Sequence, residues 1–156
     1  MIACNTDEHW MREALCEARL ASEEGEVPVG AIAVAGDKIV GRAHNVREAT
    51  HNPLGHAELL LLQKLSSDKK SWRLEDVTVY VTCEPCLMCA GALLQARVKR
   101  VVYGCMDPKA GAFGSLYDVA NDPRLNHQIE VTPGVLAKEC SKMMSDFFGK
   151  LRKRGH

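Results

Sequence analysis

The spacing of apolar residues along the chain changes repeatedly between a helical and a strand-like period. Near the N-terminus they recur every three to four positions, which predicts an amphipathic helix that Asp7 caps and Gly25 ends. Two β-rich segments, 27–34 and 38–46, follow and meet across Ala35-Gly36-Asp37, a hairpin signal. The remaining pattern predicts strands at 77–82, 100–103 and 129–131, and helices at about 56–65, 86–96, 115–120 and 138–152.

This order of elements predicts an α/β fold with three layers (α/β/α), in which helices cover both faces of a five-stranded mixed sheet. The sequence has no internal repeat, low-complexity stretch or linker. At 156 residues the chain is long enough for a core of its own, so we expect a single domain over residues 1–156. The polar segment 47–55 and the glycine-rich segment 104–114 are expected to be loops.

Four consecutive leucines, Leu59 to Leu62, point around a whole turn of the helix predicted at 56–65. A helix that is apolar all round is buried on more than one side, whereas one sheet covers only one side. Either a second helix of the same chain or a second copy of the protein covers the other side. The pattern alone does not choose between these two arrangements.

The composition limits the partners and the compartment. Twenty basic and 20 acidic side chains balance, so any nucleic-acid partner must be bound by local charge. No apolar run is long enough to cross a membrane, and the N-terminal residues lack the apolar segment of a secretory signal peptide. The odd number of cysteines and a Cys-x-x-Cys spacing favour reduced thiols in a cytoplasmic protein over a disulfide framework. The seven are Cys4, Cys16, Cys83, Cys86, Cys89, Cys105 and Cys140.

The strongest chemical signal is the segment His56-Ala57-Glu58, followed 30 positions later by Cys86 and Cys89 after Pro85. It supplies three nitrogen or sulfur ligands and one carboxylate that is not a ligand. Three protein ligands leave a tetrahedral zinc ion with an open fourth position, which takes water and lowers its pKa to about 7. The two cysteines are one helical turn apart, and Pro85 suits the first turn of a helix. The pattern therefore predicts a hydrolytic metal site.

Each of these residues also has a simpler explanation. His56 could merely begin a helix, the cysteines could be small core residues, and Glu58 could be a first-turn carboxylate favoured by the helix dipole. Two residues along a regular helix is a rotation of about 200°, so His56 and Glu58 share a face only where the first turn is irregular. The conjunction of all four residues nevertheless favours a catalytic site.

Cys83 extends the spacing to Cys83-x-x-Cys86-x-x-Cys89, which is also typical of iron–sulfur proteins. That run usually continues with a fourth cysteine, and the corresponding position here is Leu93. Cys83 continues the alternation of the valines in strand 77–82, so we expect it to pack rather than bind metal. A structural zinc site would need a fourth ligand, and the candidates His44, His51 and Cys105 have no characteristic spacing.

These motifs resemble the cytidine-deaminase-like zinc deaminases, a superfamily whose established signature pairs a His-x-Glu segment with Pro-Cys-x-x-Cys. Longer segments look like the bacterial tRNA-specific adenosine deaminases, over nearly the whole chain. The chain departs from that pattern at Leu54-Gly55, Asn52-Pro53 and Cys83. The matching segments are Glu26-Val27-Pro28-Val29-Gly30-Ala31, Asn45, Glu84-Pro85-Cys86-x-Met88-Cys89-Ala90-Gly91-Ala92, Asp107-Pro108-Lys109-Ala110-Gly111-Ala112, Gly114-Ser115-Leu116, Asn126-His127 and Ser145-Asp146-Phe147-Phe148.

The resemblance implies a homodimer with one zinc ion per subunit, held by His56, Cys86 and Cys89. The implied reaction converts adenosine to inosine at the wobble position of the anticodon of an arginine tRNA. Zinc-bound hydroxide would attack C6 of the flipped-out base, and Glu58 would carry the proton from water to the ring nitrogen. The partner implied is therefore the tRNA anticodon stem-loop.

The resemblance also implies substrate contacts away from the metal. It assigns Asn45 to the target base, and Asp107 and Lys109 to the nucleotide groove. It further assigns Phe148 to packing against RNA, where stacking would contribute about 1–3 kcal/mol. On the sequence alone, a turn residue is the favoured explanation of Asn45, and the other three could belong to a solvated loop or the core. The remaining substrate contacts are Val27 and Pro85.

The basic C-terminal segment has two explanations. Its side chains could contact tRNA phosphates, or they could complement the negative end of the last helix. The segment comprises Lys150, Arg152, Lys153 and Arg154.

Two other functions are compatible with the motifs. A deaminase of free bases or nucleosides, such as guanine or cytosine, would use the same zinc and Glu58, but would not need the loop at 107–114 or the Phe147-Phe148 tail. A non-catalytic RNA-binding module stabilised by zinc would not need Glu58. The loop and the tail therefore distinguish the first alternative, and Glu58 distinguishes the second.

Overall fold

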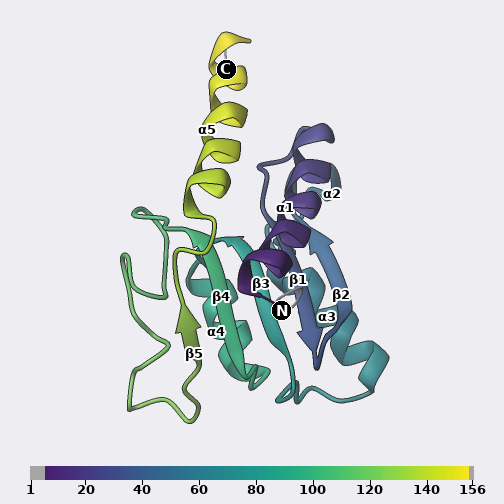
Figure 1. Cartoon of the computed structure of the whole chain (residues 1–156), viewed down its shortest axis with the longest axis vertical. Helices are drawn as coiled ribbons and strands as arrows, with labels where there is room; N and C mark the ends of the chain where they lie inside the picture. Colours follow the sequence, from purple (N-terminus) through teal and green to yellow (C-terminus); the bar gives the residue numbers. More distant parts are fainter. Residues whose placement is uncertain (1–5, 155–156) are drawn as a thin grey trace.

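The computed structural model describes residues 6–154, so Cys4 lies outside the described part of the chain. The chain begins with α1 and a hairpin, continues with strands that alternate with helices, and ends with the long helix α5 (Figure 1). The elements are α1 (Asp7–Glu23), β1 (Gly30–Ala35), β2 (Lys38–His44), α2 (Arg47–Thr50), α3 (Ala57–Lys69), β3 (Thr78–Cys83), α4 (Leu87–Gln95), β4 (Arg100–Cys105), β5 (Glu130–Thr132) and α5 (Ala137–Lys153).

The strands form one mixed sheet in the order β2-β1-β3-β4-β5. β1 pairs antiparallel with both β2 and β3, whereas β3–β4 and β4–β5 are parallel. The parallel register places Cys83, the last residue of β3, opposite Cys105, the last residue of β4. The predicted five-stranded mixed sheet is therefore confirmed.

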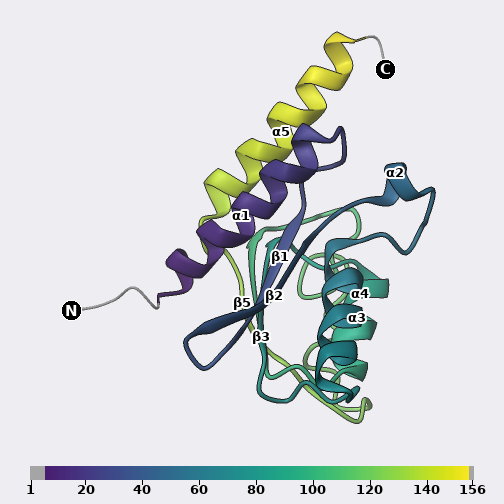
Figure 2. The same cartoon turned by 90° about the vertical axis from the view of Figure 1, so that its right-hand side faces the viewer.

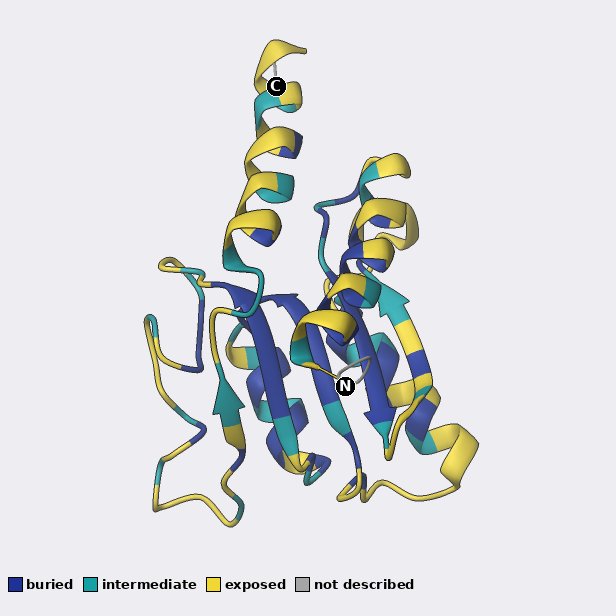
Figure 3. Cartoon of the chain, viewed as in Figure 1, coloured by how far each residue is buried: buried dark blue, intermediate teal, exposed yellow. Residues whose placement is uncertain are grey.

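Helices cover the two faces of the sheet in pairs. α1 and α5 lie on one face, and α3 and α4 lie on the other (Figure 2). The interiors of β1, β3 and β4 are buried on both faces (Figure 3), as expected for a sheet between two helical layers. The predicted three-layer arrangement is confirmed. None of the helices within residues 6–154 combines the length and apolar character that crossing a membrane requires.

Glycine allows α1 to pack directly on the sheet. A Cβ atom at Gly30 would collide with the backbone of α1 at Ala14 and Ala18. Next to this contact, Met11, Ala14 and Ala18 are completely buried, which is the apolar stripe that the sequence predicts. The core on this face consists of Trp10, Met11, Ala14, Leu15, Ile32, Val34, Tyr80, Cys83, Val102, Cys105 and Cys140.

Two predicted boundaries in the first third of the chain are wrong. Thr6, not Asp7, caps α1, because its side chain accepts a hydrogen bond from the N–H of His9. Asp7 instead pairs with Arg100 and accepts a hydrogen bond from the hydroxyl of Tyr80. The first strand begins at Gly30 rather than position 27, since the N–H of Val29 bonds back to the carbonyl of Val27 in a tight turn.

The segment 47–55, predicted as a loop, contains the short helix α2. Its first turn is held by Glu26, a buried residue whose carboxylate accepts hydrogen bonds from the N–H groups of Glu48 at 3.0 Å and Ala49 at 2.7 Å. A carboxylate at the start of a helix satisfies the N–H groups that have no partner within the helix. The helix thus depends on a residue about 20 positions away, which local patterns do not reveal.

The helix predicted at 115–120 is absent, and this segment forms turns. The backbone N–H of Ser115 donates to the buried carboxylate of Glu84. The N–H of Gly114 bonds to the carbonyl of Tyr117, and Phe113 bridges to Asp118. The N–H of Val119, which a helix would direct to the carbonyl of Ser115, bonds instead to the carbonyl of Ala112 at 3.0 Å. The loop predicted at 104–114 begins later than expected, because β4 continues to Cys105 through its pairing with β3.

The four leucines of α3 are buried to different extents. Leu61 and Leu62 are buried in the core with the apolar residues of α4, whereas Leu59 and Leu60 remain half-buried. A second helix of the same chain therefore covers part of α3. Part of its apolar surface is left uncovered.

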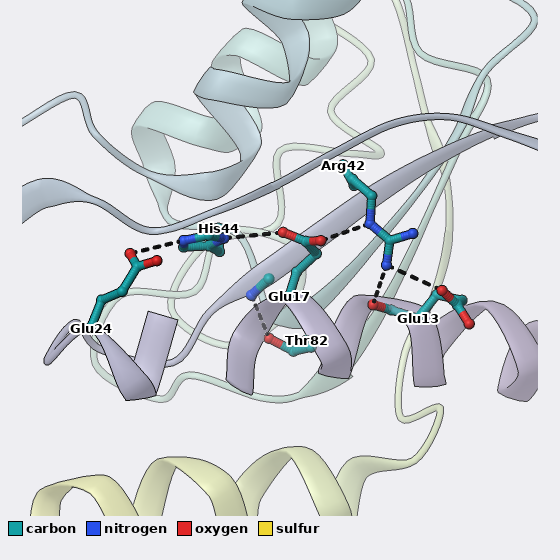
Figure 4. Close-up of polar contacts among 7 residues, drawn as sticks. Glu13, Glu17, Glu24, Arg42, His44 and Thr82 are labelled. Carbon is teal, nitrogen blue, oxygen red and sulfur yellow. Dashed lines mark hydrogen bonds and ion pairs between the residues drawn. The ribbon is translucent and has the colours of Figure 1, made fainter. Parts of the chain in front are cut away.

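The end of β2 is joined to α1 by a chain of charged side chains (Figure 4). His44 Nδ1 lies 3.0 Å from Glu17 Oε1, and its Nε2 lies 3.1 Å from Glu24 Oε1. The second oxygen of Glu17 accepts a 2.7 Å hydrogen bond from Arg42, whose guanidinium also donates to Glu13. Burial lowers the pKa of His44, but the two carboxylates together raise it by more, so its pKa lies above the ordinary 6.5.

We expect this network to make stability decrease as the pH rises. Because the folded-state pKa of His44 is raised, protonated His44 stabilises the protein fully below its unfolded-state pKa of about 6.5, and this contribution is lost as the pH rises through the folded-state pKa. Between about pH 5.5 and 8.5, Tm should therefore fall more for the parent than for His44→Gln. Glu24→Gln, which keeps one of the two carboxylates, should give an intermediate slope. Equal slopes for the parent and His44→Gln would mean that His44 binds protons equally in both states.

Candidate active site

The start of α3 and the start of α4 bring His56 and Cys86 together. Each residue is the cap immediately before its helix, with extended backbone angles of φ −83°, ψ 147° and φ −73°, ψ 175°. Neither side chain makes a capping hydrogen bond to its own helix. Both side chains are therefore available to bind a ligand between the two helix starts.

The donor atoms of His56, Cys86 and Cys89 all lie within 4.8 Å of one another. His56 Nδ1 is 3.6 Å from the sulfur of Cys86 and 3.4 Å from the sulfur of Cys89. A tetrahedral zinc ion with ordinary bond lengths would hold a nitrogen and a sulfur ligand about 3.5 Å apart. The spacing and the chemistry of this group are therefore compatible with zinc binding.

The surroundings of Cys86 favour the thiolate that metal binding requires. Its pKa is lowered to about 4, first by a hydrogen bond from Cys89 and then by His56. Its position at the start of α4 adds the positive end of the helix dipole. Sequence position and local charge thus act in the same direction.

Glu58 lies beside this group in a buried position. Only 4 % of its surface is exposed, and burial raises the pKa of its carboxyl to about 7. A carboxyl whose pKa lies near neutrality can both accept and release a proton. The expected conflict in direction between His56 and Glu58 does not arise, because His56 precedes the helix and Glu58 is the second residue within it.

A cavity of about 240 Å³ opens onto His56, Glu58 and Cys86. It also brings together three of the other predicted residues, since Val27, Asn45 and Asp107 line it. Pro85 does not line the cavity. It is buried, and its carbonyl accepts a hydrogen bond from the N–H of Ala112.

Asn45 combines the two roles that the sequence allows. Its Nδ2 donates to the carbonyl of Val27 at 3.1 Å, and its Oδ1 accepts from the N–H of Arg47 at 3.0 Å, as in a residue that holds a turn. The same side chain is buried and lines the cavity. Each amide atom retains a further hydrogen-bonding position for a ligand.

The cavity continues into a groove of about 740 Å³ between the 106–110 segment and α5. Val27, Arg47 and Asp107 line both spaces. Lys109 lines the groove from the loop and Phe148 from α5. The groove and the cavity thus form one continuous surface.

α5 separates its two neighbouring phenylalanines into different environments. Phe147 is buried with 8 % of its surface exposed, whereas Phe148 is 39 % exposed and packs edge-to-face on it at 5.3 Å. Arg152, one helical turn later, also lines the groove. Of the basic C-terminal residues, Lys153 and Arg154 are exposed but are not among those that line it.

Cys83 is not part of the three-donor group. It is buried opposite Cys105 and lines the edge of the cavity, as its place on the strand predicts.

Arg47, Glu84 and Met144 are among the cavity-lining residues that the sequence interpretation missed. Arg47 follows Asn45 by two positions, and an arginine beside a predicted base contact was a usable signal. Met144 comes from α5, which approaches the cavity only through the tertiary fold.

Comparison with known proteins agrees with the class that the fold and the site define. The MafB19-like deaminase family matches residues 5–152 of this chain. A guanine deaminase from Nitrosomonas europaea has the same fold, with a TM-score of 0.76 at 18 % identity over 91 % of this chain and 84 % of that one. The predicted cytidine-deaminase-like fold is confirmed, and the protein is a hydrolytic deaminase.

More similar proteins narrow the class. The tRNA-specific adenosine deaminase of Bacillus subtilis is 49 % identical over 148 residues, which is 95 % of this chain and 92 % of that protein. The corresponding Haemophilus influenzae protein is 45 % identical over 148 residues, or 94 % and 86 % of the two chains. A solved structure from work on A-to-I editing by tRNA:A34 deaminases has a TM-score of 0.83 at 36 % identity, covering 86 % and 98 %. The chain belongs to the tRNA-specific adenosine deaminase family.

Proposed function

We propose that this protein converts adenosine to inosine at the wobble position of a tRNA anticodon, that of an arginine tRNA, in the cytoplasm. The observation that carries the proposal is the continuity of the two spaces. A buried carboxyl and a His/Cys/Cys group share a cavity of about 240 Å³, which leads into a groove of about 740 Å³ with basic and aromatic walls. A free base would need only the first space, whereas a nucleotide within RNA needs both.

One zinc ion per chain, held by His56, Cys86 and Cys89, would supply the Lewis acidity that makes water nucleophilic at neutral pH. Glu58 is placed to accept the proton of that water and deliver it to a ring nitrogen of the base. Its pKa of about 7 suits both steps. Asn45 would orient the base through the free positions of its carboxamide.

The groove would hold the nucleotides that flank the target base. Phe148 offers an aromatic face, and Lys109 and Arg152 offer positive charge to phosphates. Asp107 and Val27 line both the groove and the cavity. RNA binding is thus compatible with the neutral composition of the whole chain, because only the groove has to be basic.

Arg152 provides a test of the groove. We expect Arg152→Ala to weaken binding of an anticodon stem-loop and to reduce the slope of log K against log salt by about 0.7, the value for one phosphate contact on a single strand. Lys153→Ala is the matched control, because Lys153 is adjacent and exposed but does not line the groove. An unchanged slope in Arg152→Ala would assign the basic segment to the helix dipole instead.

We also propose that two copies of the chain form a dimer through α3 and α4. The uncovered apolar surface lies there, around a groove of about 590 Å³ lined by Leu59, Leu62, Trp72 and Ala92. Trp72 is 55 % exposed, which is unusual for a large aromatic residue. Sedimentation of the full chain should give about twice the 17.2 kDa of one copy, and a 17.2 kDa species at micromolar concentration would exclude the dimer.

The substrate is tested by a direct comparison. The zinc-loaded protein is expected to form inosine in an arginine-tRNA anticodon stem-loop, and to release no ammonia above background from free adenosine, guanine or cytosine. A stem-loop with guanosine at the wobble position is the matched negative control. Turnover of the free compounds alone would replace the tRNA assignment by a free-base or nucleoside deaminase.

A further inference from the structure

Glu84 is a buried carboxylate that the proposed chemistry does not use. It follows β3 directly and precedes Pro85 and Cys86, and only 3 % of its surface is exposed. Its Oε1 accepts hydrogen bonds from the N–H of Asp107 at 3.0 Å and from the hydroxyl of Ser115. Its Oε2 accepts from the N–H groups of Phe113 and Ser115, both at 3.0 Å. Within residues 6–154, no lysine or arginine side chain is paired with it.

These bonds connect three separate points of one loop to a single side chain. The 107–115 loop contains no strand or helix, so its shape depends on such tertiary bonds. A buried carboxylate requires hydrogen-bond partners for both of its oxygens. Hydrogen bonds from backbone N–H groups to a carboxylate are stronger than those between neutral groups. The fit is close, because a Cβ atom at Gly111 would collide with the Glu84 carboxyl group.

The loop held in this way forms part of both the cavity and the groove. Asp107 and Ala110 line the two spaces, and Lys109 lines the groove. The backbone of Glu84 is also bonded to β4, through its N–H and the carbonyl of Cys105 at 2.9 Å. One residue therefore fixes the loop relative to the strand end that leads to Cys86.

We propose that Glu84 is a positioning residue that sets the 107–115 loop in its RNA-binding shape before the substrate arrives. The proposal rests on the proposed function, since it assigns the loop to RNA. A preformed loop spares the binding step the entropy of ordering it, so its effect falls on substrate binding more than on the chemical step.

Glu84→Gln tests this proposal, because the amide keeps the size of the side chain but replaces two acceptors of the carboxylate by a donor group. We expect hydrogen exchange at the amides of Asp107, Phe113 and Ser115 to accelerate by about tenfold or more. KM for the anticodon stem-loop should rise by about tenfold, with kcat changed much less and one zinc ion per chain retained. Gly111→Ala, which displaces the carboxylate but keeps its charge, should shift KM in the same direction.

Asp7→Asn is the control for a merely structural role. Asp7 is also a hydrogen-bonded carboxylate, but its partner Arg100 begins β4, at the opposite end from the site. The Asp7→Asn substitution should lower Tm without changing KM for the stem-loop. The proposal would be overturned if Glu84→Gln left hydrogen exchange in the loop unchanged or lost its zinc. A fall in kcat as large as the rise in KM would also overturn it. A parent protein that does not act on RNA refutes the proposed function, and the exchange data then decide separately whether Glu84 holds the loop.

Discussion

Replacement of Glu58 by alanine is expected to reduce the rate of inosine formation by at least about a thousandfold, while the protein keeps its fold and one zinc ion per chain. The carboxyl is buried beside the metal-binding group, with a pKa of about 7, and no other carboxyl among the residues lining the cavity except Glu84 and Asp107 is present to replace it. Those two are engaged by backbone N–H groups of the 107–115 loop. The measurement is single-turnover deamination of the stem-loop, together with metal analysis.

Glu58→Gln separates proton transfer from shape. The amide fills the same space and cannot exchange a proton at neutral pH, so its loss of rate should match that of Glu58→Ala. RNA affinity should change little in either variant, because the groove residues are untouched. A variant at position 58 that turns over at the parent rate would remove Glu58 from the chemistry and favour a non-catalytic RNA-binding module.

The second large effect is expected at Cys89, whose replacement by alanine should abolish both zinc binding and deamination. Two ligands do not hold zinc in a site that needs three from the protein, and a site without zinc has no activated water. We expect zinc content to fall from one per chain to below about one tenth, and activity to fall by at least about a thousandfold. Cys89 is completely buried, so unfolding must be excluded by the thermal transition.

Cys83→Ala is the matched control for Cys89→Ala. Both positions are buried thiols, and each lies three residues from Cys86 in the chain. Cys83 faces Cys105 across the strand pair rather than the metal-binding group, so its loss should cost only about 1 kcal/mol of stability and leave the zinc content at one. Loss of zinc in both variants would mean that the three cysteines act together, as in an iron–sulfur run.

The structure brings His56, Cys86 and Cys89 together, and the spacing of the two cysteines could be predicted because it is local. Pro85 indicates the start of a helix, and Cys86 and Cys89 then lie one turn apart whatever the rest of the chain does. The three layers and the five-stranded mixed sheet were also predictable, because the apolar periods are clear, whereas the order of the strands needed the structure. The sequence could not show whether the side chains of Glu58 and His56 point toward the same site, because this depends on which residue is the first within the helix.

The parts that failed are those in which contacts from outside a segment decide its backbone. The 115–120 segment forms turns instead of the predicted helix, because the N–H of Val119 bonds to the carbonyl of Ala112 rather than to that of Ser115. α2 forms in a polar segment because Glu26 supplies its cap from another loop. Met144, which comes from α5, joins the cavity only after the fold brings the chain together. Local patterns contain no information on such contacts.

The arrangement around the metal can be measured directly by X-ray absorption at the zinc edge of the purified protein. We expect one zinc ion with two sulfur neighbours at about 2.3 Å and two nitrogen or oxygen neighbours at about 2.0 Å, one of them from solvent. Binding of a substrate analogue should change the light neighbours and leave both sulfurs in place. Three or four sulfur neighbours, or a fourth ligand from the protein that closes the site, would contradict the account.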